Sequence, residues 1–208
     1  MNSIIVWLWE GLPHTSDSRL EEDGKPMLII GLMNVDAQIR HEQEYARNLS
    51  VAKLMTTRDE LTVAKNKHAY NNLEYELNNE INEGKEPEFA VVVCDVNGLK
   101  KVNDTLGHQA GDAYIQSVFG IICNVYKHSP VFRIGGDEFV VICQGHDLEH
   151  IIELMDVMEA SNVLNKKKGE VQIAYGMSVY DKDPDVAAVF ERADQRMYEK
   201  KALMRKII

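Results

Sequence analysis

Basic residues, cysteine and long apolar runs are all scarce in this chain of 208 residues. Its 23 Lys and Arg are outnumbered by 33 Asp and Glu, a formal net charge of −10 at pH 7. That balance argues against a nucleic-acid partner, which would need a basic face. The longest apolar runs, FAVVVC and FVVIC, are far too short to span a bilayer, so we expect no membrane segment. A small phosphorylated ligand is still compatible with this charge if a metal ion or a few lysines and arginines offset the repulsion.

The three cysteines do not form a recognisable motif. Cys94, Cys123 and Cys143 are far apart in apolar surroundings, and no CxxC or Cys/His spacing predicts a zinc site. Reduced, buried thiols are typical of a cytosolic protein. The early run SIIVWLW has neither the basic flank nor the small-residue cleavage site of a signal peptide. We therefore expect a cytoplasmic protein.

The chain is expected to have three regions. Residues 1–35 hold two short apolar runs around a polar, turn-rich segment, which predicts two strands of a small antiparallel sheet. Residues 36–58 lack Pro and Gly and carry apolar residues at helical spacings, which predicts a connector helix. That helix is either an ordinary surface helix or one that pairs with its twin in a dimer. Residues 59–208 form the main domain.

The main domain has an α/β (α+β) pattern, with a mixed central sheet flanked by helices. A continuous apolar strand is expected at 89–96, as when both faces of a sheet are covered. A hairpin is expected from VFRI at 131–134 and FVVIC at 139–143, and a last strand at 171–180. Helices are predicted at 66–84, 111–129, 147–161 and 186–206.

Three carboxylates are expected to converge at one end of this sheet. Asp95 follows the strand run FAVVVC, at the kind of strand end where open α/β sheets bind ligands, although it could merely cap the next turn. Asp137 and Glu138 stand at the hairpin tip. Side by side, the three would repel by roughly 1 kcal/mol per pair in water and by more when desolvated. Mg²⁺ removes that conflict, because it takes carboxylate oxygens and bridges to substrate phosphates.

Other polar residues suit a nucleotide. The segment DVNGLKKVNDTLGHQAGD at 95–112 crowds five of them into one loop-helix-loop: Lys100, Asn103, Asp104, His108 and Asp112. Asn103 can donate to and accept from a base edge, Asp112 can accept from purine N–H groups, and Lys100 can meet a phosphate. Lys201 and Arg205, spaced i, i+4 on the last helix, either reach a phosphate chain or form a solvated basic helix end.

The main domain resembles the GGDEF family, the diguanylate cyclases. The matching motifs are RIGGDEF at 133–139, DVNGLKKVNDTLGHQAGD at 95–112 and RADQRMYEKK at 192–201, with a weaker match in DELTVAKNKHAY at 59–70. The resemblance covers about 57–205 and implies a nucleotidyl-cyclase-like fold. It also implies an enzyme that condenses two GTP into cyclic di-GMP and two pyrophosphates. The active form would be a homodimer in which each chain presents one GTP.

The resemblance also implies a role for each matching residue. Four positions would hold Mg²⁺ or Mn²⁺, and their three carboxylates would be the catalytic groups: Asp95, Val96 through its carbonyl, Asp137 and Glu138. Asp137 would assist deprotonation of the attacking 3′-hydroxyl. Eight positions would bind the substrate: Lys100, Asn103, His108, Asp112, Gly135, Gly136, Lys201 and Arg205. Among them, Asn103 and Asp112 would read guanine, the three basic side chains would contact phosphates, and the glycines would leave room for the nucleotide.

The chain also departs from the family pattern. Many members carry an RxxD product-inhibition site that ends six residues before the first glycine of the signature, and this chain has Tyr126 and Ser129 in place of its Arg and Asp. Weak feedback by cyclic di-GMP is therefore expected. The stretch DGKPMLIIGLMNVDAQIRHEQE resembles the last strands and exit helix of a PAS sensor domain, so residues 1–35 are expected to be a partial PAS-like segment. Two rival functions stay open: a catalytically weak GTP-binding regulatory module, and a cyclase that makes mixed purine dinucleotides.

Overall fold

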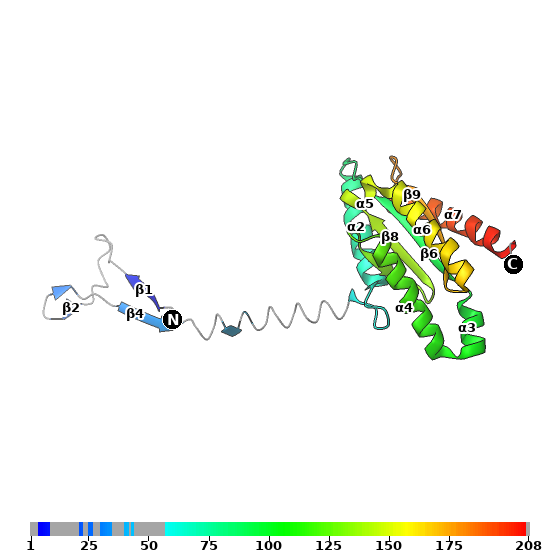
Figure 1. Ribbon diagram of the computed structural model, residues 1–208. Helices are drawn as coiled ribbons and strands as arrows, with labels where there is room; N and C mark the ends of the chain where they lie inside the picture. Colours follow the sequence, from blue (N-terminus) through cyan, green and yellow to red (C-terminus); the bar gives the residue numbers. More distant parts are fainter. Residues whose placement is uncertain are drawn as a thin grey trace. The chain divides into compact units, whose positions relative to one another are not determined.

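The computed structural model describes residues 4–8, 21–22, 25–26, 30–34, 40, 41, 43 and 57–206, with side chains described at 40, 41, 43 and 57–204. The chain divides into two compact units, Met1–Leu54 and Met55–Ile208 (Figure 1). None of the described helices is long and apolar enough to cross a membrane.

The first unit contains the small antiparallel sheet that the sequence predicts. Strand β1 (Ile4–Leu8) pairs antiparallel with β4 (Ile30–Asn34), and the short β2 (Glu21–Glu22) pairs with β3 (Lys25–Pro26). The predicted connector helix at 36–58 lies mostly outside the described residues, among which Arg40, His41, Gln43 and Thr57 are helical.

The second unit is built on a mixed sheet of five strands in the order β5-β7-β8-β6-β9. These are β5 (Lys65–Asn66), β7 (Val131–Arg133), β8 (Glu138–Cys143), β6 (Ala90–Asn97) and β9 (Gln172–Val179). Only β5 and β7 run parallel, and the other pairs are antiparallel. The predicted α/β fold with a mixed sheet is confirmed. Strand β5 is an addition, too short to show a period in the sequence.

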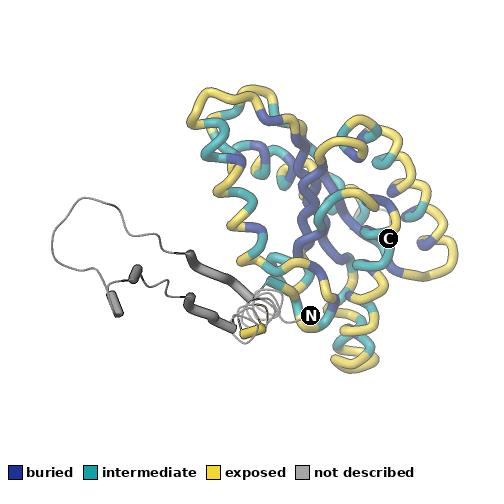
Figure 2. The backbone as a smooth tube through the Cα atoms, turned by 90° about the vertical axis from the view of Figure 1, so that its left-hand side faces the viewer, coloured by how far each residue is buried: buried dark blue, intermediate teal, exposed yellow. Residues whose placement is uncertain are grey.

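Helices cover both faces of this sheet. Successive residues of β6 point to opposite faces, so Val92 and Cys94 join one hydrophobic cluster and Val91 and Val93 join the other. The first cluster is closed by α4 (His108–Val125) and α6 (Ile151–Lys168), and the second by α2 (Lys67–Asn82) and α7 (Val186–Lys206). Figure 2 shows the buried sheet between the more exposed helices. This double burial explains why β6 reads as a continuous apolar run.

The helices differ in detail from their predicted ranges. Helix α4 begins at His108 and follows a short helix α3 (Leu99–Leu106), because Gly107 adopts φ +85° and interrupts what would otherwise be one helix. Helix α5 (Gly145–Glu149) precedes α6. Helix α6 continues to Lys168, where Gly169 (φ +69°) forms a left-handed cap and three lysines in the last turn complement the helix dipole.

One glycine sets how closely α7 approaches the sheet. A Cβ atom on Gly176 of β9 would lie 2.2 Å from the carbonyl oxygen of Ala193 and 2.3 Å from the backbone nitrogen of Met197. Both atoms belong to the backbone of α7, so the helix rests directly on the strand. This contact fixes the position of the helix that carries Lys201.

Candidate active site

Two acidic residues face each other across β6 and β8. The antiparallel register places Asp95 opposite Glu138. The next residue, Val96, donates its backbone N–H to the carbonyl oxygen of Asp137 (3.0 Å), so its backbone faces the hairpin. Backbone N–H and C=O groups alternate in direction along a strand, so those of Asp95 point toward β9. Asp95 and Glu138 therefore form a non-hydrogen-bonded pair. Cα atoms in such pairs are about 4.5 Å apart and the side chains are close.

The tip of the hairpin completes this corner of the sheet. Ile134 donates its N–H to the carbonyl oxygen of Glu138 (3.1 Å) and closes the turn. The N–H and C=O of one strand residue point to the same side, so the Val96 carbonyl also faces the tip. Asp95 is buried, Asp137 is half-buried and Glu138 is exposed. The structure therefore brings Asp95, Val96 and Glu138 together, with the backbone of Asp137 beside them.

Helix α7 supplies a cation to this corner. The Nζ atom of Lys201 donates to Oδ2 of Asp95 at 2.6 Å, and the two side chains are 22% and 6% exposed. Three residues further along the helix, Met204 accepts a contact of 3.2 Å from the amide of Asn97, the last residue of β6. Lys201 is thus directed into the acidic corner and is not simply part of a solvated basic helix end.

The donor atoms and charges of this corner suit a hard divalent cation. Asp95 and Glu138, with Asp137 next to Glu138 at the hairpin tip, carry three formal negative charges, and the ammonium of Lys201 offsets one of them. All the candidate ligand atoms are oxygens, the type that Mg²⁺ and Mn²⁺ prefer. A bound Mg²⁺ or Mn²⁺ would balance the charge, with Asp95, Glu138 and the Val96 carbonyl as candidate ligands.

Arg133 holds the hairpin in place, a role that no sequence pattern predicted. Arg133 Nη1 donates to both carboxylate oxygens of Asp59 (3.0 and 3.2 Å), and Nη2 donates to the carbonyl oxygen of Gly136 (2.7 Å). Asp59 is held in turn by the backbone N–H and hydroxyl of Thr62 (2.9 and 2.7 Å). The motif that begins at Asp59 therefore positions the GGDEF turn. Asp59 begins the motif DELTVAKNKHAY and Arg133 begins RIGGDEF, and these motifs were the sequence signal for the two residues.

The contacts with Arg133 and Thr62 change the pKa of the Asp59 carboxyl. Partial burial by itself raises its pKa, but the hydrogen bonds from Thr62 and Arg133 and the arginine charge outweigh burial and hold the pKa below its ordinary value of 3.8. Asp59 therefore remains charged at neutral pH, which keeps the arginine in place.

Helices α3 and α4 present the predicted base-reading residues. Asn103 lies against Gly111, where a Cβ atom would be only 1.8 Å from its Oδ1. That Oδ1 is buried and accepts no hydrogen bond within the described part of the chain. A buried acceptor of this kind is expected to bind a donor group of a ligand. The hydroxyl of Tyr114 on α4 donates to the Asn97 carbonyl (2.9 Å), which ties α4 to the end of β6. The pair Asn103–Gly111 is therefore anchored beside the strand that carries Asp95.

The other predicted substrate residues have simpler surroundings. Lys100, His108 and Asp112 are exposed on α3 and α4. Gly135 lies under Glu138, since a Cβ there would come within 2.8 Å of Oε2 of that carboxylate, whereas Gly136 is open. The side chain of Arg205 lies outside the described residues.

Comparison with known families identifies this arrangement. The family model described as "Diguanylate cyclase, GGDEF domain" matches residues 56–206. The chain belongs to the GGDEF family. Its second unit is the GGDEF domain, and the corner formed by Asp95 and Glu138 lies within the matched residues.

Relatives support the assignment. Diguanylate cyclase A from Treponema denticola is 32% identical over 177 residues, which cover 81% of this chain and 48% of that protein. The diguanylate cyclase DgcS from Shewanella oneidensis is 28% identical over 197 residues, covering 92% of this chain and 65% of that protein. The chain thus spans about half to two thirds of the length of these relatives.

The fold is also found in solved structures. The coiled coil and GGDEF domain of DgcB from Caulobacter crescentus, solved in complex with c-di-GMP, superposes with a TM-score of 0.66 at 25% identity and covers 80% of this chain and 92% of that one. The GGDEF domain of PA1120 from Pseudomonas aeruginosa gives 0.58 at 26% identity, covering 70% and 89%.

Proposed function

We propose that this protein is a diguanylate cyclase, which condenses two GTP into cyclic di-GMP and releases two pyrophosphates. The observation that carries the proposal is the cross-strand pair of Asp95 and Glu138, with Lys201 paired to Asp95, in a chain of the GGDEF family. The named cyclases among its relatives point to the same reaction. A cytoplasmic location fits the three free cysteines of the GGDEF domain.

The side chains at the sheet corner would act on the triphosphate. Asp95, Glu138 and the Val96 carbonyl would hold Mg²⁺ or Mn²⁺. The bound cation would neutralise charge on the phosphates, the main requirement of phosphoryl transfer. Asp137, at the hairpin tip, would take the proton of the attacking 3′-hydroxyl. The hydroxyl oxygen then bonds to the α-phosphorus of the other GTP, and pyrophosphate leaves with the electrons of the broken bond.

The remaining predicted residues would select and orient GTP. Asn103 and Asp112 would bond the guanine edge, with His108 close by. Lys100, Lys201 and Arg205 would contact phosphates, for which Lys201 would exchange its bond to Asp95 for one to the substrate. The open surface at Gly136, and the space beside Glu138 that the missing side chain of Gly135 leaves, would admit the nucleotide. Arg133 would act as a positioning residue, because its guanidinium donates to the Gly136 carbonyl of the hairpin and to Asp59.

The reaction joins two bound GTP molecules, so we propose a homodimer as the active form. Each chain would present one GTP, and the connector region at 36–58 would carry the pairing or signalling function between a PAS-like segment at 1–35 and the GGDEF domain from residue 59. The sequence resemblance to a PAS domain and the antiparallel pairing of β1 with β4 support this division.

Product analysis tests the proposal. The full chain is incubated with GTP, ATP and Mg²⁺, and products are separated by chromatography while pyrophosphate is assayed. We expect cyclic di-GMP from the wild type, no product from Glu138→Gln, and normal turnover from the matched control Glu76→Gln, which alters an exposed glutamate of α2.

The same experiment separates the rivals. A dimeric sample that binds GTP but yields no dinucleotide would establish the regulatory module instead. Mixed purine dinucleotides would show relaxed base choice. Unchanged turnover in Glu138→Gln would refute the metal assignment.

A further inference from the structure

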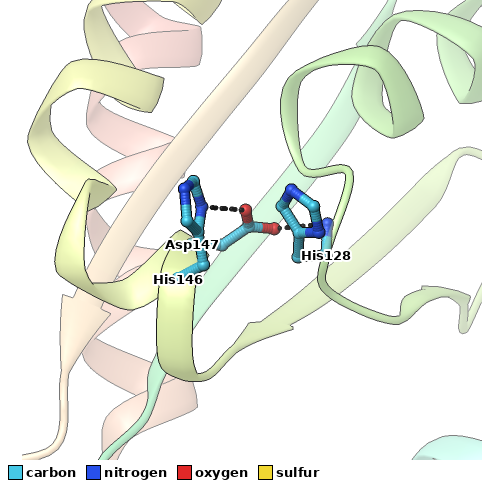
Figure 3. A group of neighbouring side chains, drawn as sticks. All are labelled: His128, His146 and Asp147. Carbon is cyan, nitrogen blue, oxygen red and sulfur yellow. Dashed lines mark hydrogen bonds and ion pairs between the residues drawn. The ribbon is translucent and has the colours of Figure 1, made fainter.

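A second cluster of metal-ligating side chains lies at the opposite end of the GGDEF hairpin (Figure 3). His128 stands in the turn before β7, and His146 and Asp147 belong to α5, just after β8. Because β7 and β8 pair antiparallel, the turn that precedes β7 lies beside the start of α5, which follows β8. The proposed active site uses none of these residues.

The carboxylate of Asp147 is the fixed centre of this cluster. It is 2% exposed, and its Oδ2 accepts the backbone N–H of His128 at 3.0 Å. Its Oδ1 lies 3.7 Å from Nδ1 of His146, whose side chain is 62% exposed. The two imidazoles flank this carboxylate in Figure 3, with ring centroids 4.7 Å apart. A buried carboxylate is costly unless charged or hydrogen-bonded partners surround it, so a cation bound beside Asp147 would be stabilised by its charge.

A third imidazole supports the arrangement. His150 stacks on His146 with centroids 4.5 Å apart and an interplanar angle of 21°. Its Nδ1 lies 2.9 Å from the carbonyl oxygen of His146 and donates to it in the corresponding tautomer. His150 thereby packs against both the ring and the backbone of His146.

One ligand atom from each of His128, His146 and Asp147 lies within 4.8 Å of the others. Around tetrahedral zinc, with bonds of about 2.0–2.1 Å, ligand atoms are roughly 3.3 Å apart. The gap is small, and the two exposed imidazoles can close it by side-chain rotation while Asp147 stays in place. Two histidines and one carboxylate also form a ligand set of catalytic and exchangeable zinc sites, in which water takes the fourth position.

We propose that His128, His146 and Asp147 form a binding site for a late first-row divalent cation such as Zn²⁺. The site is chemically distinct from the acidic corner, because imidazole nitrogens suit Zn²⁺ whereas an all-oxygen set suits Mg²⁺. The proposed zinc site and the acidic corner lie at opposite ends of β8, whose length from Glu138 to Cys143 is about 17 Å. A bound cation ties together the two segments that enter and leave the hairpin.

Zinc binding to the full chain, measured by competition with a chromophoric chelator in excess Mg²⁺, tests the proposal. We expect one Zn²⁺ per chain in the wild type. His128→Gln and His146→Gln each weaken zinc binding by about tenfold or more, since even supporting residues of metal sites contribute that much. Asp147→Asn keeps an acceptor for the His128 N–H but loses the charge, and weakens zinc binding likewise.

Two control variants locate the site. His68→Gln removes an exposed histidine of α2, and Glu138→Gln alters the acidic corner; both bind zinc as the wild type does. Equal urea midpoints without zinc show that the two histidine variants are folded. The proposal is overturned if His128→Gln and His146→Gln bind zinc as tightly as the wild type, if Glu138→Gln abolishes the binding, or if no zinc binds.

Discussion

Replacing Gly111 by alanine tests whether Asn103 reads the substrate base. The new Cβ would lie 1.8 Å from Oδ1 and 2.9 Å from Cγ of Asn103, so the asparagine side chain must turn away. Losing a hydrogen-bonded contact to a ligand costs about 1–3 kcal/mol. At about 1.4 kcal/mol per tenfold, the KM for GTP should rise by roughly fivefold to 140-fold.

Gly120 offers a matched control within the same helix. Both glycines belong to α4, and a Cβ on Gly120 would meet nothing within 4 Å. Alanine there gains up to about 1 kcal/mol of stability from helix propensity and leaves KM unchanged. The same gain at Gly111 offsets the cost of moving Asn103, so the free energy of unfolding should change by less than about 1 kcal/mol.

The assay is pyrophosphate release measured against GTP concentration, with urea unfolding of each variant in parallel. A KM for Gly111→Ala within about twofold of the wild type, in a folded protein, would show that the position of Asn103 does not matter for GTP binding. A large loss of stability would show instead that the close contact is structural.

Three further predictions follow from other contacts. Gly176→Ala should lower the free energy of unfolding by about 3 kcal/mol, the upper end of overpacking costs, because its Cβ meets the backbone of α7; a urea midpoint near that of the wild type would contradict the packing. Asp59→Asn should be less stable than the wild type at neutral pH. Because the folded-state pKa of Asp59 is depressed, its contribution is present above about pH 4 and is lost as the pH falls through the folded-state pKa, so the gap between the two urea midpoints should shrink in acid; a gap that does not change with pH would refute this assignment. Added cyclic di-GMP should inhibit turnover only weakly, since Tyr126 and Ser129 replace the RxxD pair, and strong inhibition at low concentration would reveal another binding site.

Much of the fold and the core of the site could be predicted because the signals are local. The double-sided burial of β6 appears as a continuous apolar run, and the hairpin appears as two such runs around Gly-Gly-Asp-Glu. Asp95 is marked by its place at a strand end and Glu138 by its place at a turn. Strand burial and chain reversal therefore place each carboxylate at the end of a strand, and the pairing of β6 with β8 brings the two together. The boundaries of α4 and α6 depended on glycine conformations that periodicity does not reveal.

By itself, the sequence determined the α/β pattern, the places of Asp95 at a strand end and Glu138 at a turn, and the family motifs, because each depends on residues close along the chain. Only the tertiary structure decided which side chains pair with one another in the site. Arg133 meets Asp59 across 74 positions and Lys201 meets Asp95 across 106, and neither distance has a signature in periodicity. The cysteine and histidine spacing predicted no zinc site, yet the pairing of β7 with β8 brings His128 beside Asp147. Contacts of this kind are made by packed strands and helices, so only the folded chain reveals them.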